Sequence, residues 1–253
     1  MQQFKKDLLQ VVKSVNRKEM GKNAATAVAF LIKKLLLSKN EVNIIFAAAP
    51  SQLSFFESMI HDQNINWSRI NAFHMDEYIG LPKGHPALFS SFLNRNLFNK
   101  VAFKSVHYLL NENEENITDS NKSYGKLLNR FPADIICLGI GENGHLAFND
   151  PSNADFNDPN TIKVVELDED CRIQQVNDGC FDSLAGVPTH AITLTIPMLM
   201  RGKHLCCIVP GDLKREAIKK TLSGNIVSDC PASILRTHPS AILFGDDESL
   251  REF

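Results

Sequence analysis

Two adjacent carboxylates stand where a proton-transfer role would be natural. Asp76 and Glu77 follow the segment RINAF (69–73), which is typical of a buried strand. Successive side chains of a strand point to opposite faces, so one carboxylate can face a cleft at the strand end while the other points away. A solvated pair of turn acids explains the same residues, and the spacing alone leaves both interpretations open.

A histidine on a glycine-rich turn is the second candidate for proton transfer. The segment 139–151 reads GIGENGHLAFNDP, and its glycines permit positive φ angles and a close approach of the backbone to a ligand at Gly141. His145 follows the last glycine, so the segment departs from the dinucleotide-binding fingerprint. With Asn143 and Asp150 nearby, His145 is suited to exchange a proton near neutral pH. A structural or solvated loop histidine is the alternative.

Two segments have the composition of an anion site. The turn AAAPSQ, with Ala48, Ala49, Ser51 and Gln52, joins a predicted strand to a predicted helix, where backbone N–H groups and the serine hydroxyl could receive a phosphate. Lys214 falls in the first turn of a later helix, an unfavourable place for the helix dipole, which indicates that its charge serves a ligand. A plain N-cap at Ser51 and a surface lysine explain these residues equally well.

The elements that must position these groups alternate between short apolar runs and longer amphipathic stretches. That alternation predicts an α/β fold, a three-layer sandwich with a mostly parallel, Rossmann-like doubly wound central sheet, in which ligands bind beyond the carboxyl ends of the strands. Strands are predicted at 42–47, 70–75, 106–110, 134–140, 162–167, 191–196, 204–209 and 241–244. Helices are predicted at the N-terminus and at 23–37, 51–60, 87–98, 118–129 and 212–222.

Composition excludes several classes of protein. The 253 residues contain no linker, low-complexity tract or repeat, so we expect one domain spanning 1–253. A net charge of −2, without long blocks of one sign, argues against nucleic acid or a membrane surface as partner and favours a small molecule. The apolar run 31–37 is interrupted by two lysines, and the N-terminus lacks the features of a secretory signal, so we expect a cytoplasmic protein.

The six cysteines show no CxxC spacing, so buried free thiols are expected rather than a disulfide framework or a structural zinc site. No metal-ligand cluster or cofactor motif is evident in the sequence. Whether copies assemble into a homo-oligomer is left open.

Four segments together resemble the glucosamine-6-phosphate deaminase family, within the larger group that includes 6-phosphogluconolactonases. They are MDEYIGLPKGHP (75–86), GENGHLAFNDP (141–151), VPTHAITLTI (187–196) and SILRTHPSAILFGDD (233–247). The resemblance extends over nearly the whole chain. Its MDEY and GHLAFN segments favour the deaminase branch over the lactonase branch.

The resemblance implies an enzyme that converts a 2-amino-2-deoxyhexose 6-phosphate to the ketose 6-phosphate plus ammonia. Asp76 matches the base that moves a proton from C2 to C1, and His145 matches the acid/base that opens the ring, with Asn143 and Asp150 as its orienting groups. Lys214 matches a phosphate-binding lysine, and the turn 48–52 occupies the place of the phosphate loop.

The ligand-binding positions depart from the family pattern. The loop usually reads PTGGTP, whereas this chain has AAAPSQ, and Gln175 and Asn177 stand near the position of a phosphate-binding arginine. Residue 150 is Asp where Glu is common, which shortens the carboxylate by one methylene. Hydrolysis of a sugar-phosphate lactone and non-catalytic binding of a sugar phosphate therefore stay as alternatives.

Overall fold

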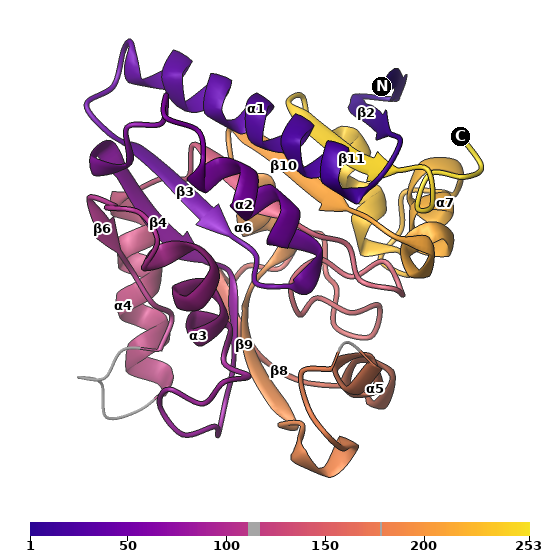
Figure 1. Ribbon diagram of the computed structural model, residues 1–253. Helices are drawn as coiled ribbons and strands as arrows, with labels where there is room; N and C mark the ends of the chain where they lie inside the picture. The colour runs from indigo at the N-terminus through magenta and orange to yellow at the C-terminus, as the bar shows by residue number, and fades with distance from the viewer. Residues whose placement is uncertain (111–116, 178) are drawn as a thin grey trace.

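The computed structural model describes residues 1–110, 117–177 and 179–253, and two β-sheets organise them (Figure 1). The larger sheet has eight strands in the order β1-β2-β11-β10-β7-β3-β4-β6, and every neighbouring pair is parallel except β1 with β2. Its strands are β1 (Gln2–Lys6), β2 (Leu9–Ser14), β3 (Val42–Phe46), β4 (Ile70–His74), β6 (Ser105–Val106), β7 (Ile135–Leu138), β10 (His204–Val209) and β11 (Ala241–Asp246). The prediction of a mostly parallel central sheet is confirmed.

Helices cover both faces of this sheet. The helices of the described residues are α1 (Arg17–Leu36), α2 (Leu53–Ile60), α3 (Phe89–Leu93), α4 (Ile117–Arg130), α5 (Glu169–Asn177), α6 (Ile196–Met200) and α7 (Arg215–Ser223), of which α5 packs beside the small sheet described below. Shorter helical turns are η1 (Pro50–Gln52), η2 (Trp67–Arg69), η4 (Leu184–Gly186), η5 (Asp212–Lys214) and η6 (Pro231–Thr237), and the π-helical turn η3 (Asn94–Phe98) continues α3. In Figure 1, α1 and α2 lie together across one face of the sheet.

The two faces of the sheet have separate hydrophobic cores, which is the three-layer arrangement that the sequence predicts. On one face, α1 and α2 bury residues such as Val28 and Phe55 against Ile44 of β3. On the other face, α4, α6 and α7 pack against the alternate strand positions, among them Ile45 and Ile136. Because both faces are covered, the inner strands read as continuous apolar runs rather than alternating ones.

A second sheet has three antiparallel strands in the order β5-β9-β8: β5 (Asp76–Tyr78), β8 (Ile162–Glu166) and β9 (His190–Leu194). Two of the predicted strands, at 162–167 and 191–196, therefore lie outside the central sheet. The chain passes from β4 of the large sheet to β5 of the small one through a single residue, Met75.

The predicted N-terminal helix is wrong, because residues 2–14 form the β1–β2 hairpin and α1 starts at Arg17. Leu9 and Val11 alternate with less buried neighbours along β2, and both are fully buried beside β11. Asp7 has a φ of 51° in the tight turn, a conformation that aspartate tolerates better than most residues. The alternation of apolar and less buried residues along β2 therefore determines a strand, although the segment was predicted to be a helix.

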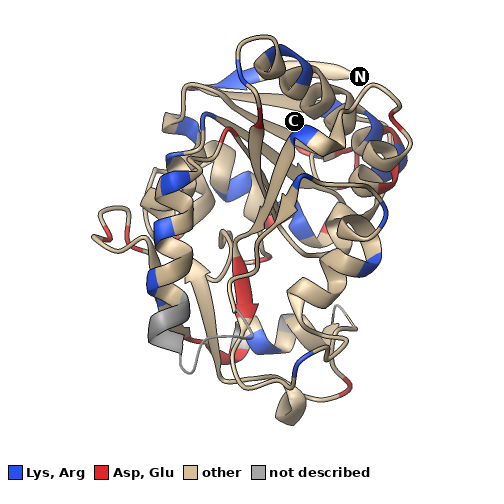
Figure 2. Cartoon of the chain, turned by 90° about the vertical axis from the view of Figure 1, so that its left-hand side faces the viewer, with Lys and Arg blue, Asp and Glu red and all other residues tan. Residues whose placement is uncertain are grey.

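The remaining predicted elements overlap observed ones, with these differences. The predicted strand 106–110 shares only Val106 with the two-residue strand β6, and β5, α5 and α6 have no counterpart among the predicted elements. Basic and acidic positions are interspersed over the elements (Figure 2). None of the described helices is both long enough and apolar enough to cross a membrane. All six cysteines are free thiols, as expected, and five of them are buried.

Candidate active site

A cavity of about 560 Å³ opens at the carboxyl edge of the large sheet, where four adjacent strands end. Each strand contributes one predicted site residue to its lining: Lys214 follows β10, His145 follows β7, Ser51 follows β3 and Asp76 follows β4. Parallel strands bring their carboxyl ends to one edge, so residues more than 150 positions apart in the chain meet there. A volume of this size is ordinary for a small-molecule site.

Asp76 and Glu77 have opposite orientations, as the strand geometry predicts. Asp76 lines the cavity and is only 7% exposed, and its Oδ1 has no hydrogen-bond partner within the described part of the chain. Glu77 is buried on the other side, where it accepts hydrogen bonds from the backbone N–H groups of Tyr78, Phe89 and Ser90 at 2.8–3.0 Å. Glu77 therefore caps the start of α3, and Asp76 is the carboxylate available to a ligand.

The surroundings of Asp76 shift the pKa of its carboxyl group. Burial, reinforced by the neighbouring negative charge of Glu77, raises the pKa of Asp76 well above its ordinary value. A carboxylate that is poorly solvated and unpartnered is a stronger base than one in water. This is the electrostatic arrangement expected of a general base that works near neutral pH.

A buried network fixes the backbone that carries Asp76. Nε2 of His74 accepts a hydrogen bond from the N–H of Leu109, so its Nδ1 carries the proton and donates to the carbonyl oxygen of Asp76 at 2.9 Å. Burial lowers the pKa of His74, which keeps the ring neutral. The hydroxyl of Tyr124 donates to the carbonyl of His74 and accepts from its N–H, so the end of β4 is held on both sides.

His145 is held by the two residues that the sequence placed beside it. Its Nδ1 lies 2.9 Å from Oδ1 of Asp150, whose side chain is fully buried. Asn143 accepts a hydrogen bond from the N–H of His145 and donates another to Asp150 at 2.8 Å. With Nδ1 turned toward Asp150, Nε2 is the ring nitrogen available to a ligand. The ring lies directly over Gly141, where an added Cβ would come within 2.1 Å of it, so this position accepts no side chain.

Asp150 stays ionised beside the histidine. Burial by itself would raise its pKa, but the hydrogen bond and charge of His145, together with the amide of Asn143, outweigh burial and lower the pKa of Asp150. An ionised Asp150 favours a proton on Nδ1 and stabilises the ring when it takes up a second proton. The shorter aspartate thus reaches the histidine despite the missing methylene.

Cys171 of α5 is a neighbour of this group that spacing did not reveal. One ligand atom each from His145, Asp150 and Cys171 lie within 4.8 Å of one another, a grouping able to hold a metal ion in principle. Burial, followed by the charge of Asp150, raises the pKa of the Cys171 thiol. In its protonated state the Cys171 S–H can donate a hydrogen bond to the Asp150 carboxylate. The grouping is not evident in the sequence because Cys171 lies 21 positions beyond Asp150.

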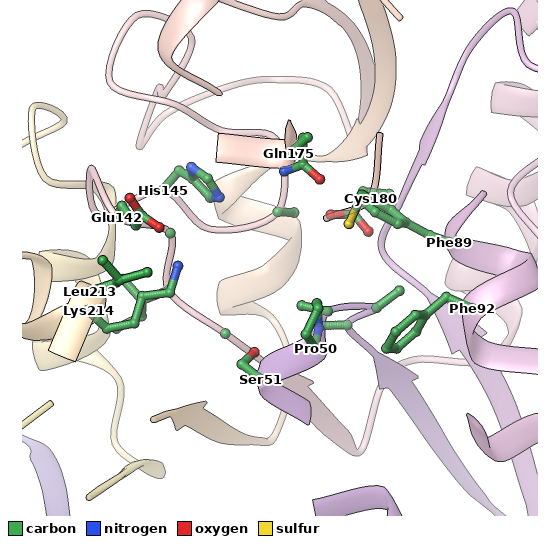
Figure 3. Close-up of a pocket in the computed structure, with 18 of the residues that line it drawn as sticks. Pro50, Ser51, Phe89, Phe92, Glu142, His145, Gln175, Cys180, Leu213 and Lys214 are labelled. Atoms are coloured by element: carbon green, nitrogen blue, oxygen red, sulfur yellow. The ribbon is translucent and has the colours of Figure 1, made fainter. Parts of the chain in front are cut away.

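The predicted anion-binding residues take two different positions. Ser51 and Lys214 both line the cavity, from the turns after β3 and β10, with Ala48 and Ala49 beside Ser51 (Figure 3). Gln52 is fully buried and does not line the cavity: its amide lies behind Ser51 and donates to the Ser51 hydroxyl oxygen at 3.1 Å. Gln52, which was predicted to contact a ligand, contacts Ser51 instead.

The rest of the lining is largely apolar and was not recognised from the sequence. Phe89 and Phe92 of α3 form one wall, opposite Leu213 and Lys214 (Figure 3). Gln175 of α5 also faces the cavity. Helical spacing makes such phenylalanines look like core residues, so no sequence pattern distinguishes them from the rest of the hydrophobic interior.

Comparison with known proteins gives a consistent picture. The family model for glucosamine-6-phosphate isomerases/6-phosphogluconolactonase matches residues 15–243. Glucosamine-6-phosphate deaminases from Bacillus cereus (strain B4264) and Bacillus thuringiensis (strain Al Hakam) are each 34% identical over 220 residues, which is 87% of this chain and 81% of each relative.

Solved structures agree with these matches. The structure of a monomeric glucosamine-6-phosphate deaminase superposes with a TM-score of 0.85 at 28% identity, covering 95% of this chain and 98% of that one. A 6-phosphogluconolactonase from Thermotoga maritima shares the fold, with a TM-score of 0.73 at 18% identity over 94% of this chain and 98% of that one. The region matched by the family model contains all four strand ends that build the cavity, and the chain belongs to the glucosamine-6-phosphate isomerase/6-phosphogluconolactonase family.

Proposed function

We propose that the protein converts a 2-amino-2-deoxyhexose 6-phosphate, either glucosamine 6-phosphate or galactosamine 6-phosphate, to the ketose 6-phosphate and ammonia. The observation that carries the proposal is the pairing of two proton-transfer groups on separate elements around one cavity. Asp76 reaches it from the end of β4 and His145 from the turn after β7, and deaminases are among the relatives.

Two separate groups suit a reaction with protons at two places on the sugar. His145 takes the proton of the anomeric hydroxyl and supplies one to the ring oxygen, which opens the ring. Asp76 then removes the proton from C2 of the open chain, giving an enolamine, and returns it to C1 to give a ketimine. Water adds to C2 of the ketimine and ammonia leaves, so the overall reaction consumes one water.

The turns after β3 and β10 support binding of the phosphate. Lys214 contributes a positive charge, while the Ser51 hydroxyl and the backbone at Ala48 and Ala49 offer neutral polar groups. Arg17 and Arg95 also line the cavity, so its lining carries further positive charge that favours an anionic ligand.

The decisive experiment measures ammonia release from glucosamine 6-phosphate and galactosamine 6-phosphate, with exchange of the C2 proton for solvent deuterium as a second readout. Release from either sugar supports the proposal. Folded protein that releases none, yet hydrolyses 6-phosphogluconolactone, would establish the lactonase alternative. Calorimetric binding of the sugar phosphates without turnover of any of the three compounds would identify a sugar-phosphate-binding protein.

Three further proposals concern the whole chain. We propose that residues 1–253 form one domain, which the pairing of β2 with β11 supports because it joins the two ends of the chain in one sheet. We propose a cytoplasmic location, which the free thiols support. The solved relative is described as monomeric, so size-exclusion chromatography with light scattering should distinguish a 28.3 kDa monomer from a homo-oligomer.

A further inference from the structure

We infer that Gln52 is a positioning residue that fixes the hydroxyl of Ser51 as a hydrogen-bond donor toward the cavity. The inference rests on the proposed function, because it takes the phosphate of the substrate to be the group that receives this hydrogen bond. The Ser51 hydroxyl, oriented by the Gln52 amide, would then take the role that a glycine-rich phosphate loop has in the family pattern.

The orientation of the Gln52 amide follows from its two partners. Its Nε2 lies 3.1 Å from the carbonyl oxygen of Ile208 in β10 and 3.1 Å from Oγ of Ser51. A backbone carbonyl oxygen can only accept, so the NH₂ end of the amide must face Ile208. The second hydrogen of that NH₂ group is then directed at Ser51, whose oxygen must accept it.

This arrangement determines where the Ser51 proton can go. A hydroxyl has one hydrogen to donate, and its oxygen already accepts from Gln52. Among the described residues, the Ser51 hydroxyl donates no hydrogen bond, and Ser51 lines the same cavity as Lys214. The hydroxyl is therefore prepared to donate to an acceptor-only group such as a phosphate oxygen.

Stability alone does not explain a glutamine at this position. Gln52 is fully buried, and among the described residues its Oε1 has no hydrogen-bond partner, which costs about 1–3 kcal/mol for a polar atom removed from water. Gly139, directly after β7, lies against the pair, because an added Cβ there would be in ordinary contact at 3.4 Å from the amide nitrogen and 3.6 Å from the Ser51 oxygen. An apolar side chain would satisfy the core better but could not orient the serine.

The test is a double-mutant cycle with inorganic phosphate as the probe. Its dissociation constant is measured by isothermal titration calorimetry for the wild type, Ser51→Ala, Gln52→Met and the double variant, and KM and kcat are measured with the sugar phosphate that releases ammonia. We expect Ser51→Ala to weaken phosphate about tenfold and Gln52→Met about three- to tenfold, as for the loss of one hydrogen bond to a charged group. In the Ser51→Ala background, Gln52→Met should change phosphate affinity by less than about twofold. KM should follow phosphate affinity, while kcat stays within about twofold.

Two controls keep the outcome interpretable. Gln10→Met makes the same change at an exposed glutamine of β2 and should leave phosphate affinity unchanged. Gln52→Glu, used also if Gln52→Met does not fold, keeps the shape but offers only acceptors, so the Ser51 proton should turn away from the cavity. It should weaken phosphate at least as much as Ser51→Ala, and the Ser51→Ala/Gln52→Glu double variant measures the effect of the charge alone.

Equal weakening by Gln52→Met with and without Ser51 would overturn the inference, since Gln52 would then act through the fold. No weakening by Ser51→Ala would overturn it as well, because the hydroxyl would not be the phosphate donor. Ammonia release by the wild type is an independent result. Coupling between Gln52 and Ser51 without ammonia release would retain the inference for another phosphorylated ligand while rejecting the proposed reaction.

Discussion

Asp76, the proposed general base, is buried, so the properties that suit it to activity reduce the stability of the fold. Its raised pKa means that the folded protein binds the proton more tightly than the unfolded chain does. The stabilisation from this proton is complete below the ordinary aspartate pKa and is lost as the pH rises through the raised pKa. At neutral pH, where the group must be ionised to act as a base, the fold bears the cost of a buried charge.

The substitution Asp76→Asn should therefore separate the two effects. We expect kcat for ammonia release to fall by about 10²–10⁴, because the base is lost. At pH 8 the melting temperature should rise by about 2–8 °C, and the gain should shrink toward pH 4, where the wild-type carboxyl is also neutral. Asp229→Asn, at an exposed site, is the matched control. A melting temperature that does not rise at pH 8 would contradict the assigned burial cost.

The wild-type pH profile provides a related expectation at the same residue. Because Asp76 must lose its proton to act, the acid limb of kcat should lie well above the ordinary aspartate pKa of 3.8. An acid limb close to that value would mean either that another group is the base or that Asp76 is solvated in the substrate complex.

Asn143 offers a test of positioning beside the histidine. Asn143→Ala removes both the acceptor for the His145 N–H and the donor to Asp150. We expect kcat to fall about 10- to 100-fold, since small displacements of a proton-transfer group are costly, while phosphate affinity stays unchanged. Asn157→Ala, an exposed asparagine of the same region, is the control. A loss of phosphate affinity together with kcat would indicate that the whole turn collapses.

At the residue scale, the sequence identifies the groups with distinctive chemistry and misses those defined by distant partners. Asp76, His145 and Lys214 are visible because carboxylates, histidine and lysine stand out beside strand ends. The contact between Gln52 and Ile208 joins residues 156 positions apart, and no spacing rule predicts it. Cys171 is hidden for the same reason, since its neighbour Asp150 lies on another element.

At the scale of elements, α3 depends on one buried carboxylate. Glu77, 1% exposed, accepts three backbone hydrogen bonds, two of them from the start of α3, which presents Phe89 and Phe92 to the cavity. A short helix has few hydrogen bonds of its own, so loss of its cap affects it strongly. The wall of the cavity is therefore fixed through the residue next to the base.

The substitution Glu77→Gln should destabilise the protein by about 1.5–3 kcal/mol, because the amide cannot accept all three N–H groups as the carboxylate does. Thermal and urea unfolding measure this change, and Glu57→Gln on the exposed side of α2 serves as the control. KM should rise as the phenylalanine wall loosens. Unchanged stability would mean that water or another group satisfies the freed N–H groups.

The elements themselves were predictable where periodicity was unambiguous. The strand at 204–209 agrees with β10 at both ends because its apolar run is short and bounded by turn residues. The N-terminal hairpin was missed because its stability comes from pairing with β11, more than 230 residues away, rather than from local preference. The small sheet was missed because the sequence of an apolar strand does not indicate which sheet the strand belongs to.

For the molecule as a whole, anion binding should be coupled to stability. A ligand that binds only the folded protein stabilises it by about 1.4 kcal/mol at ten times its dissociation constant. Inorganic phosphate at that level should raise the melting temperature by about 3–6 °C, compared with chloride at equal ionic strength. Lys214→Met should abolish most of this shift, whereas Lys220→Met, exposed on α7, should retain it. An undiminished shift in Lys214→Met would place the anion elsewhere.

The one-residue connection from β4 to β5 through Met75 restricts which insertions and deletions this segment of the gene can tolerate. Asp76 and Glu77 differ in role only because consecutive strand residues alternate in direction, and both are acids. Deletion of one codon between β4 and Asp76 would turn Glu77, an acid of the wrong length, toward the cavity and leave α3 without its cap. Insertion of one codon would place Asp76 beside α3 and leave no acid facing the cavity. Single residues of this segment can be substituted without changing which way their neighbours point, whereas residues cannot be added or removed without reversing those directions.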